Sequence, residues 1–233
     1  MELQNKLNSL FFLCYNGYGD NMICTSNYKQ DFSSKHKLVS ISGDRGKKEE
    51  FNGECFSLLA PKKDFWEIWH SNIGNALPAD NNRYYITEFY KQVLSKLDCE
   101  DVYNMLDGSI LLCYEKNYEF CHRQIVAAWF ELFLDIEVPE IKVKNGNIQV
   151  VERDSSIKHV LEQVIRENVD MKGFKSLRGY YLNEKSKKCT MEAIKLERNG
   201  DPSYIDFKNK AYQYKVKALL FEKEYLKNPR NVK

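Results

Sequence analysis

Three short apolar runs constrain the fold of this chain more than any other feature. They cover residues 10–15, 37–42 and 109–114 and are bounded by the turn signals Asn16-Gly17, Gly43 and Asp107-Gly108. Near-continuous apolar runs of this length are typical of strands that are buried on both faces of a sheet. The chain is therefore predicted to contain a central sheet that is covered on both sides.

Helical patterns separate these runs. Apolar residues recur at helical spacing within 64–72, 84–97 and 119–134. Buried strands that alternate with amphipathic helices favour a mostly parallel sheet with helices on both faces, which is a Rossmann-like α/β fold. The segment 140–151 carries Asn145-Gly146 between alternating residues and predicts a hairpin near the edge of the sheet.

The character of the chain changes after residue 153. A helix pattern opens at Ser156, a polar lysine-rich stretch covers 171–188, and a long charged helix is predicted for 204–226. Residues 1–153 hold 17 basic and 22 acidic residues, whereas 154–233 hold 18 basic and 11 acidic residues. These features predict two domains, a Rossmann-like domain at 1–153 and a basic, mainly helical region at 154–233.

The total charge of +2 argues against binding to nucleic acid, but the basic C-terminal region makes such binding possible again. In 171–233, lysines and arginines are interleaved with Phe174, Tyr180 and Tyr181, which suits contact with a DNA or RNA backbone. A plain solvated surface is the alternative. Acidic residues are mixed into the last helix, which favours docking on a protein partner or formation of a homo-oligomer.

The composition also bears on the compartment. The seven cysteines are odd in number and irregularly spaced, which favours reduced thiols over a secreted disulfide scaffold. No apolar run reaches the roughly 18 residues of a membrane span or resembles a signal peptide. We therefore expect a cytoplasmic protein without a membrane partner. With 43% apolar residues, the chain is too apolar for a disordered protein.

The residues most suited to chemistry lie between the third apolar run and the following helix. Strand alternation places Cys113 and Glu115 on one face, and Cys121, His122 and Arg123 enter from the start of the helix. In open α/β sheets, ligands bind beyond the carboxyl ends of the strands. Two thiols, a carboxylate, an imidazole and a guanidinium are therefore expected to converge on one crevice.

Three chemistries are open to this group. Arg123 and the helix start suit a phosphate, because a guanidinium and free helix N–H groups both bind anionic oxygens. Alternatively, Cys121 is a thiolate nucleophile, with Glu115 or His122 as acid or base. The third is a zinc site of Cys113, Cys121 and His122 with Glu115 or water. It is the weakest, because Cys-x7-Cys-His is not a standard zinc spacing. A structural role is the alternative for each residue taken singly.

Two glycine-containing loops follow the first two predicted strands. Asn16-Gly17-Tyr18-Gly19 follows the first strand, and Gly43-Asp44-Arg45-Gly46 follows the second. Both loops are expected at the same edge of the sheet, so Gly17 and Arg45 are predicted to contribute to the ligand pocket. A plain turn is the alternative, since no complete nucleotide-binding motif is present.

The pieces Cys113-Tyr114-Glu115-Lys116 and Glu119-Phe120-Cys121-His122-Arg123, followed by a helix with Trp129, resemble the signature of a bacterial family. This is the family called domain of unknown function 488, and the resemblance covers about residues 36–141. It implies a Rossmann-like sandwich with a pocket lined by the signature, but no reaction. Many members carry an arginine and a proline soon after the second strand. This chain lacks the proline, and Arg45 is the residue that could replace the family's arginine as a second anion contact.

Together these observations predict a protein that binds a nucleotide or another phosphorylated small molecule through Cys113, Arg123, Arg45 and Gly17. The alternative is a thiol- and carboxylate-dependent hydrolase or transferase acting on such a ligand, with Cys121, Glu115 and His122 as catalytic residues. No cofactor and no metal are expected.

Overall fold

The structure is a computed structural model that describes residues 22–32 and 36–228. The chain divides into two compact units between Glu167 and Asn168. This division lies after the predicted boundary at residue 153, because helix α6 (Ser155–Asn168) belongs with the first unit.

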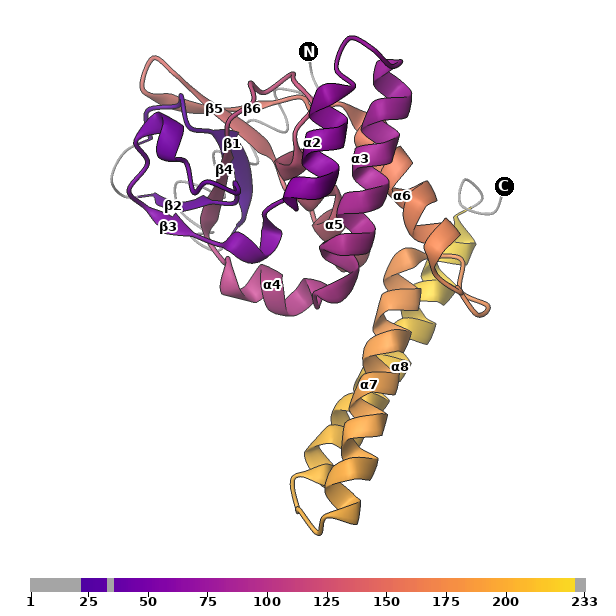
Figure 1. Cartoon of the computed structure of the whole chain (residues 1–233). Helices are drawn as coiled ribbons and strands as arrows, with labels where there is room; N and C mark the ends of the chain where they lie inside the picture. The colour runs from indigo at the N-terminus through magenta and orange to yellow at the C-terminus, as the bar shows by residue number, and fades with distance from the viewer. Residues whose placement is uncertain (1–21, 33–35, 229–233) are drawn as a thin grey trace. The chain divides into compact units, whose positions relative to one another are not determined.

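The first unit contains a six-stranded sheet (Figure 1). Its strands run in the order β3-β2-β4-β1-β5-β6, and every neighbouring pair is parallel except β5 and β6. The strands are β1 (Cys24–Asn27), β2 (Lys37–Ser40), β3 (Glu54–Cys55), β4 (Ser109–Cys113), β5 (Glu140–Lys144) and β6 (Asn147–Val151). The predicted Rossmann-like α/β class, with a mostly parallel sheet and additional C-terminal helices, is confirmed.

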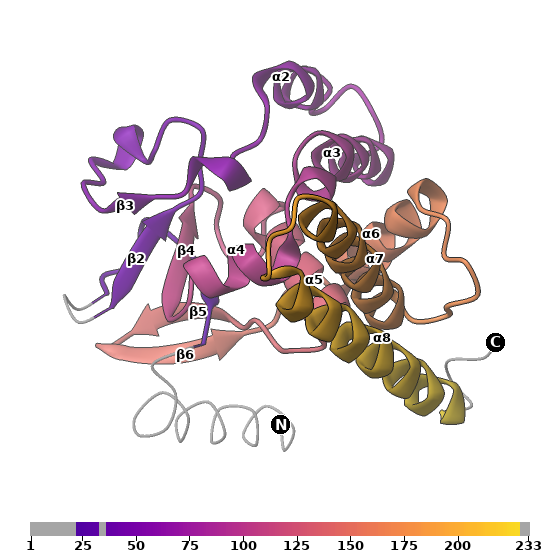
Figure 2. The same cartoon turned by 90° about the horizontal axis from the view of Figure 1, so that it is seen from below.

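The helices of the first unit pack against the sheet and against one another. The helix α5 packs against β1 and β4, α4 packs against α5, and α2 packs against α3 (Figure 2). Besides α6, the α-helices in the described part of the first unit are α2 (Lys63–Ser71), α3 (Pro78–Gln92), α4 (Cys99–Met105) and α5 (His122–Leu134). The helix predicted for 119–134 therefore begins three residues later than expected, at His122.

Both faces of the central strand β4 are apolar, as its sequence predicts. All five residues of β4 are buried. Ile110 and Leu112 belong to a cluster with Cys24 and Ile141, and alternation turns Leu111 to the opposite face, where α5 packs. A strand with this surrounding has no solvent-facing side, which explains why its sequence does not alternate.

The hairpin predicted around Asn145-Gly146 joins β5 to β6 at the edge of the sheet. Asn145 has φ 53° and Gly146 has φ 74°, so both residues adopt the left-handed conformation that a tight two-residue hairpin turn requires. The antiparallel register, with Lys144 opposite Asn147, follows directly from this turn.

The sequence did not predict the central strand β1. Its residues Thr25 and Ser26 are polar, yet both are fully buried. The Thr25 hydroxyl donates a hydrogen bond to Glu140 Oε2, and the Ser26 hydroxyl donates one to the Ile141 carbonyl. These bonds allow polar side chains at the centre of a sheet. The predicted strand at 10–15 lies outside the described residues.

The second unit contains α7 (Leu177–Arg198) and α8 (Tyr204–Lys227), which pack against each other in an antiparallel pair. The buried Glu222 of α8 holds the start of α7, because its carboxylate accepts hydrogen bonds from the Lys175 and Ser176 N–H groups and from the Ser176 hydroxyl. This carboxylate satisfies donors that the start of a helix leaves without intrahelical partners. In the described part of the chain, no helix is long and apolar enough to cross a membrane.

We expect Glu222→Ala to loosen the start of α7, because it leaves buried N–H groups without an acceptor. Losing hydrogen bonds to a charged group costs about 2–3 kcal/mol. Amide hydrogen exchange of peptides from 172–182 should accelerate by about 30-fold or more. The matched control is Glu224→Ala, which removes an exposed pair with Lys227 and should change the exchange little. Equal effects of the two variants would contradict this role of Glu222.

Candidate functional site

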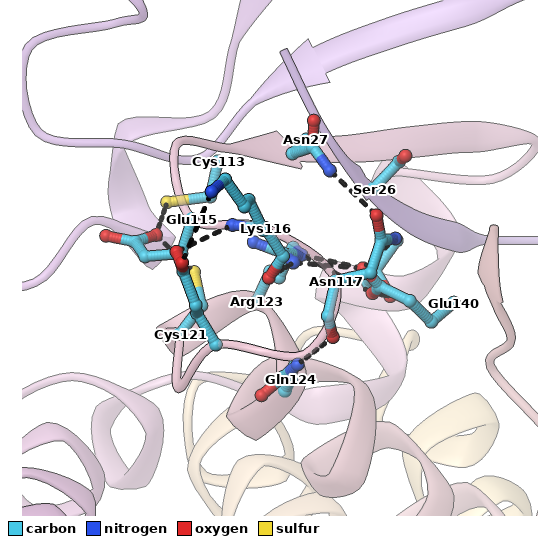
Figure 3. A network of polar contacts seen from close by, with 12 residues as sticks. Ser26, Asn27, Cys113, Glu115, Lys116, Asn117, Cys121, Arg123, Gln124 and Glu140 are labelled. Atoms are coloured by element: carbon cyan, nitrogen blue, oxygen red, sulfur yellow. Dashed lines mark hydrogen bonds and ion pairs between the residues drawn. The ribbon is translucent and has the colours of Figure 1, made fainter. Parts of the chain in front are cut away.

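The predicted constellation forms around the end of β4 and the start of α5 (Figure 3). Cys113 is the last residue of β4, and Glu115 lies in the loop that follows it. Cys121 is the residue immediately before α5, and His122 is the first residue of that helix. The structure therefore brings together four of the five residues as predicted. We call Cys113, Glu115, Cys121 and His122 the thiol cluster.

One carboxylate oxygen joins the two thiols of the cluster. Glu115 Oε2 lies 2.7 Å from Cys121 Sγ and 3.2 Å from Cys113 Sγ, and both thiols are placed to donate to it. The two cysteines are buried, whereas Glu115 is half-buried. Glu115 therefore forms the part of the cluster that is nearest to solvent.

The imidazole of His122 completes the cluster from the side of α5. Its Nε2 lies 2.9 Å from the Ile41 carbonyl oxygen, which can only accept, so the ring proton is assigned to Nε2. Nδ1 then faces the thiols, at 3.5 Å from Cys113 Sγ and 3.8 Å from Cys121 Sγ. The backbone that follows β2 thus fixes which nitrogen is available to the cluster.

The surroundings shift the proton affinities of the two thiols in opposite directions. Burial raises the pKa of Cys113 well above its ordinary value, and its hydrogen bond with Cys121 adds to this. Burial also acts to raise the pKa of Cys121, but the hydrogen bond from Cys113 and the charges of Arg123 and His122 together bring it well below the ordinary value. Cys121 is therefore the thiol that gives up its proton first.

The two other members of the cluster respond to this pattern. Burial, followed by the charge of Cys121, raises the pKa of Glu115 to about 7. Burial acts to lower the pKa of His122, but the Cys121 thiolate and Glu115 outweigh it and raise the value. These groups titrate as a set, and together they can accept or donate a proton near neutral pH.

Arg123 does not join the thiol cluster as a free anion-binding group. Its side chain is fully buried and forms an ion pair with the equally buried Glu140 of β5, at 3.0 Å between Nη2 and Oε1. The Arg123 Nε donates to the same oxygen at 3.1 Å. One edge of the guanidinium is thus already paired with a carboxylate, and the phosphate contact of Arg123 stays a prediction.

Arg123 instead fastens the loop that carries Glu115. Its Nη2 also donates to the Lys116 carbonyl at 3.0 Å, and the neighbouring Gln124 side chain donates to the Asn117 carbonyl at 3.0 Å. Asn117 in turn donates to Glu140 at 2.8 Å. Within the described residues, Arg123 Nη1 has no hydrogen-bond partner. The ion pair and the Lys116 carbonyl thus engage the Nε and Nη2 donors of Arg123.

Two predicted ligand residues remain, Arg45 and Gly17. Arg45 is exposed and has φ 63° in the turn after β2, and no hydrogen bond or ion pair of its side chain to the cluster is found in the part of the chain described. Gly17 lies outside the described residues. A second-strand anion contact through Arg45 thus stays a prediction.

The chemistry of the thiol cluster admits two uses. First, a thiol that can pass its proton to a neighbouring carboxylate can act as a covalent nucleophile. The ligand atoms of Cys113, Cys121 and His122 also lie within 4.8 Å of one another, so these residues could hold a metal ion.

A hollow of about 520 Å³ in the first unit is lined by Gln124, Glu140 and residues between 128 and 158, and by none of the thiol cluster.

The sequence did not indicate Glu140, the partner of Arg123. A signal was present, because Glu140 stands between the apolar residues Val138 and Ile141. A charged residue in such a run must be paired if the strand is buried. The identity of the partner required the register of β5 against β1, in which Thr25 lies opposite Glu140.

In the second unit, two of the three aromatic residues predicted to meet nucleic acid, Phe174 and Tyr181, contact cationic side chains. Arg178 and Lys185 lie over the Tyr181 ring, and Lys215 lies over the Phe174 ring. Lys185 also lies 5.2 Å from the centre of the Tyr214 ring. These rings are therefore occupied by cation–π contacts within the unit.

Comparisons with other proteins add no assignment. No protein-family model, no curated protein and no solved structure matches the chain. The resemblance to domain of unknown function 488 consequently stays a prediction.

We expect Arg123→Met to destabilise the first unit by about 3–5 kcal/mol, because it leaves the Glu140 carboxylate buried without its partner. Replacing both partners, as in Arg123→Met with Glu140→Leu, should restore part of the loss. Urea unfolding followed by tryptophan fluorescence measures this, since Trp66, Trp69 and Trp129 all lie in the first unit.

The matched control for this pair is Arg83→Met, which removes an exposed ion pair with Glu167. Its cost should stay below about 1 kcal/mol. Equally small losses of unfolding free energy in Arg123→Met and Arg83→Met would contradict the expected cost of breaking the buried pair.

Proposed function

We propose that the first unit is a thiol- and carboxylate-dependent enzyme, a hydrolase or transferase, in which Cys121 is the nucleophile. The contact of 2.7 Å between Cys121 Sγ and Glu115 Oε2 is the observation that supports this most directly. Cys121 also precedes α5, a helix of 13 residues, so the positive end of the helix dipole stabilises a thiolate at this position.

The roles of the other residues follow from their contacts. Glu115 accepts the thiol proton as Cys121 Sγ attacks an electrophilic atom of the substrate, and it returns that proton to the leaving group. His122, whose Nε2–H donates to the Ile41 carbonyl, stabilises the thiolate as an imidazolium through Nδ1, which lies 3.8 Å from Cys121 Sγ. Water or an acceptor molecule then breaks the bond to sulfur and regenerates the thiol. Cys113 donates to Glu115 and orients its carboxylate.

A phosphorylated substrate is supported by the cations near this loop rather than by Arg123. Lys116 is exposed and follows Glu115 directly. Lys48, also exposed, reaches the same loop, since its N–H donates to the Tyr114 hydroxyl at 3.2 Å and its ammonium lies 6.0 Å from the centre of the Tyr114 ring. These two lysines can attract an anionic group to the open side of the cluster. A purely ligand-binding function is supported less well, because Glu140 already neutralises Arg123.

Two acetyl donors that differ in charge test the nucleophile and the anionic substrate separately. Acetyl phosphate and p-nitrophenyl acetate would both transfer an acetyl group to sulfur, with a C–S bond formed and a C–O bond broken. We expect mass spectrometry to find one acetyl group per chain on Cys121 with each donor. Cys121→Ser should abolish it, and Cys55→Ser, which removes an exposed cysteine, should not.

Two further variants define the roles. Glu115→Gln should slow acetylation by about 10²-fold or more, the usual contribution of a general base. Lys116→Ala should slow the reaction with acetyl phosphate by about 10-fold and leave that with p-nitrophenyl acetate unchanged. Acetylation that persists in Cys121→Ser would refute the nucleophile, and equal effects of Lys116→Ala on both donors would refute the anionic substrate.

For the second unit we propose contact with a DNA or RNA backbone. This rests on the basic excess of 171–233 and on lysines of α7 and α8 that are exposed, including Lys188, Lys217 and Lys223. Since the aromatic rings named above already contact cations, the proposed contact is to phosphates and not to bases.

Fluorescence anisotropy with a labelled single-stranded oligonucleotide tests this on the full chain. Affinity should fall steeply with salt, and Lys188→Ala, Lys217→Ala and Lys223→Ala combined should reduce the salt slope by up to about 3. The control combines Lys63→Ala, Lys91→Ala and Lys96→Ala in the first unit and should have no effect. If both triple variants behave alike, the second unit is not the binding surface.

A further inference from the structure

We propose that the thiol cluster is a tetrahedral site for Zn²⁺, with Cys113, Cys121, His122 and Glu115 as its four ligands. Two thiolates, an imidazole and a carboxylate form a donor set that zinc accepts. Soft thiolate ligands favour zinc over magnesium or calcium, which prefer oxygen. Among the described residues, Cys113, Cys121 and His122 form the one group of three metal-ligating side chains with such closely spaced ligand atoms.

The two distances between nitrogen and sulfur in the cluster fit a tetrahedron around zinc. Zinc bonds of about 2.3 Å to sulfur and about 2.05 Å to nitrogen place tetrahedral S and N ligands about 3.5–3.6 Å apart. His122 Nδ1 lies 3.5 Å from Cys113 Sγ and 3.8 Å from Cys121 Sγ. These two edges are already within about 0.3 Å of the required length.

The fourth corner requires a small movement of Glu115. A zinc-bound carboxylate oxygen lies about 3.6 Å from a zinc-bound sulfur. Glu115 Oε2 lies 3.2 Å from Cys113 Sγ and 2.7 Å from Cys121 Sγ, where it accepts thiol protons. Zinc replaces those protons, and the carboxylate moves outward by under about 1 Å. Glu115 is half-buried, so its side chain has room on the solvent side.

The surroundings of the cluster are those of a metal centre. A histidine ligand usually donates its second ring N–H to a carbonyl or carboxylate, which fixes the ring and the available nitrogen. His122 does so with the Ile41 carbonyl. Its ring packs at 5.8 Å against that of the buried Phe89, which limits access of water. The start of α5 stabilises the single net negative charge of the zinc complex.

The arrangement of the chain explains why the sequence spacing made zinc the weakest of the three chemistries predicted for these residues. Standard zinc motifs place ligand pairs on one loop or helix, two to five residues apart. Here Cys113 ends a strand and Cys121 begins a helix, and the loop between them is fastened by Arg123 and Gln124 to the Lys116 and Asn117 carbonyls. The fold, and not the local spacing, assembles the donors.

Zinc in this site occupies the sulfur of Cys121 and thereby blocks covalent chemistry there. This consequence for activity rests on the proposed enzyme function, whereas metal binding does not. Zn²⁺ is then a reversible inhibitor of acetyl transfer to Cys121, and removal of the ion by a chelator restores the free thiol.

Titration of the chelator-treated full chain with Co²⁺ tests the site, because Co²⁺ takes the same geometry and is coloured. We expect one Co²⁺ per chain, with thiolate charge-transfer absorption and the d–d bands of tetrahedral coordination, and displacement by Zn²⁺. Cys113→Ser and His122→Ala should each weaken binding at least about 100-fold. The matched control is Cys99→Ser, another buried cysteine, which should bind as the wild type does.

Circular dichroism identifies any variant that fails to fold. Glu115→Gln changes a half-buried residue and provides a second test, because it should weaken binding about 10-fold or more and keep the thiolate bands. Absence of these bands in the wild type, or bands unchanged in Cys113→Ser, would overturn the zinc site. Acetylation of Cys121 in metal-free protein is measured separately. Zinc binding without acetylation refutes the proposed enzyme alone, and acetylation without zinc binding refutes the metal site alone.

Discussion

The buried ion pair between Arg123 and Glu140 is the interaction on which the rest of the candidate site depends. It joins the first turn of α5 to the first residue of β5, and both side chains are fully removed from water. Arg123 follows Cys121 and His122 directly, so the pair also sets where these residues stand. Through the Lys116 carbonyl, it fixes the loop that carries Glu115. A buried pair of this kind contributes little net stability, but it specifies one arrangement, since any other leaves a charge unpaired.

The sequence predicts the framework well because the framework is encoded locally. The runs that become β2 and β4, the helices α2 and α8, and the hairpin at Asn145-Gly146 all carry apolar periods or turn residues within a few positions. The strand β1 carries no such signal, because its Thr25 and Ser26 are buried through hydrogen bonds to residues more than 100 positions away. The helix α7 was missed for a related reason. Its many lysines make the apolar period of the helix hard to recognise. The acceptor at its start, Glu222, comes from α8.

The candidate site could also be predicted only in part, because some of its contacts join residues that are distant in the sequence. That a strand end and a helix start would bring Cys113, Glu115, Cys121 and His122 together could be predicted, because both elements are regular and adjacent. The role of Arg123 could not, because it depends on Glu140 and on strand pairing. The same four donors suit a nucleophile and a zinc site, since both need a thiolate stabilised by nearby positive charge. Their geometry explains why two functions with different chemistry can be proposed for one cluster.

The contact between Glu222 and the start of α7 bears on how the second unit can be synthesised. Residue 222 follows residue 176 by 46 positions, and the chain leaves the ribosome from its N-terminus. While α8 is incomplete, the first N–H groups of α7 lack this acceptor and must remain solvated. Local helix formation in α7 can begin earlier, but its start is secured only after the last turns of α8 have emerged. The second unit should therefore acquire its stable form late, nearly in one step, when most of its sequence is already available.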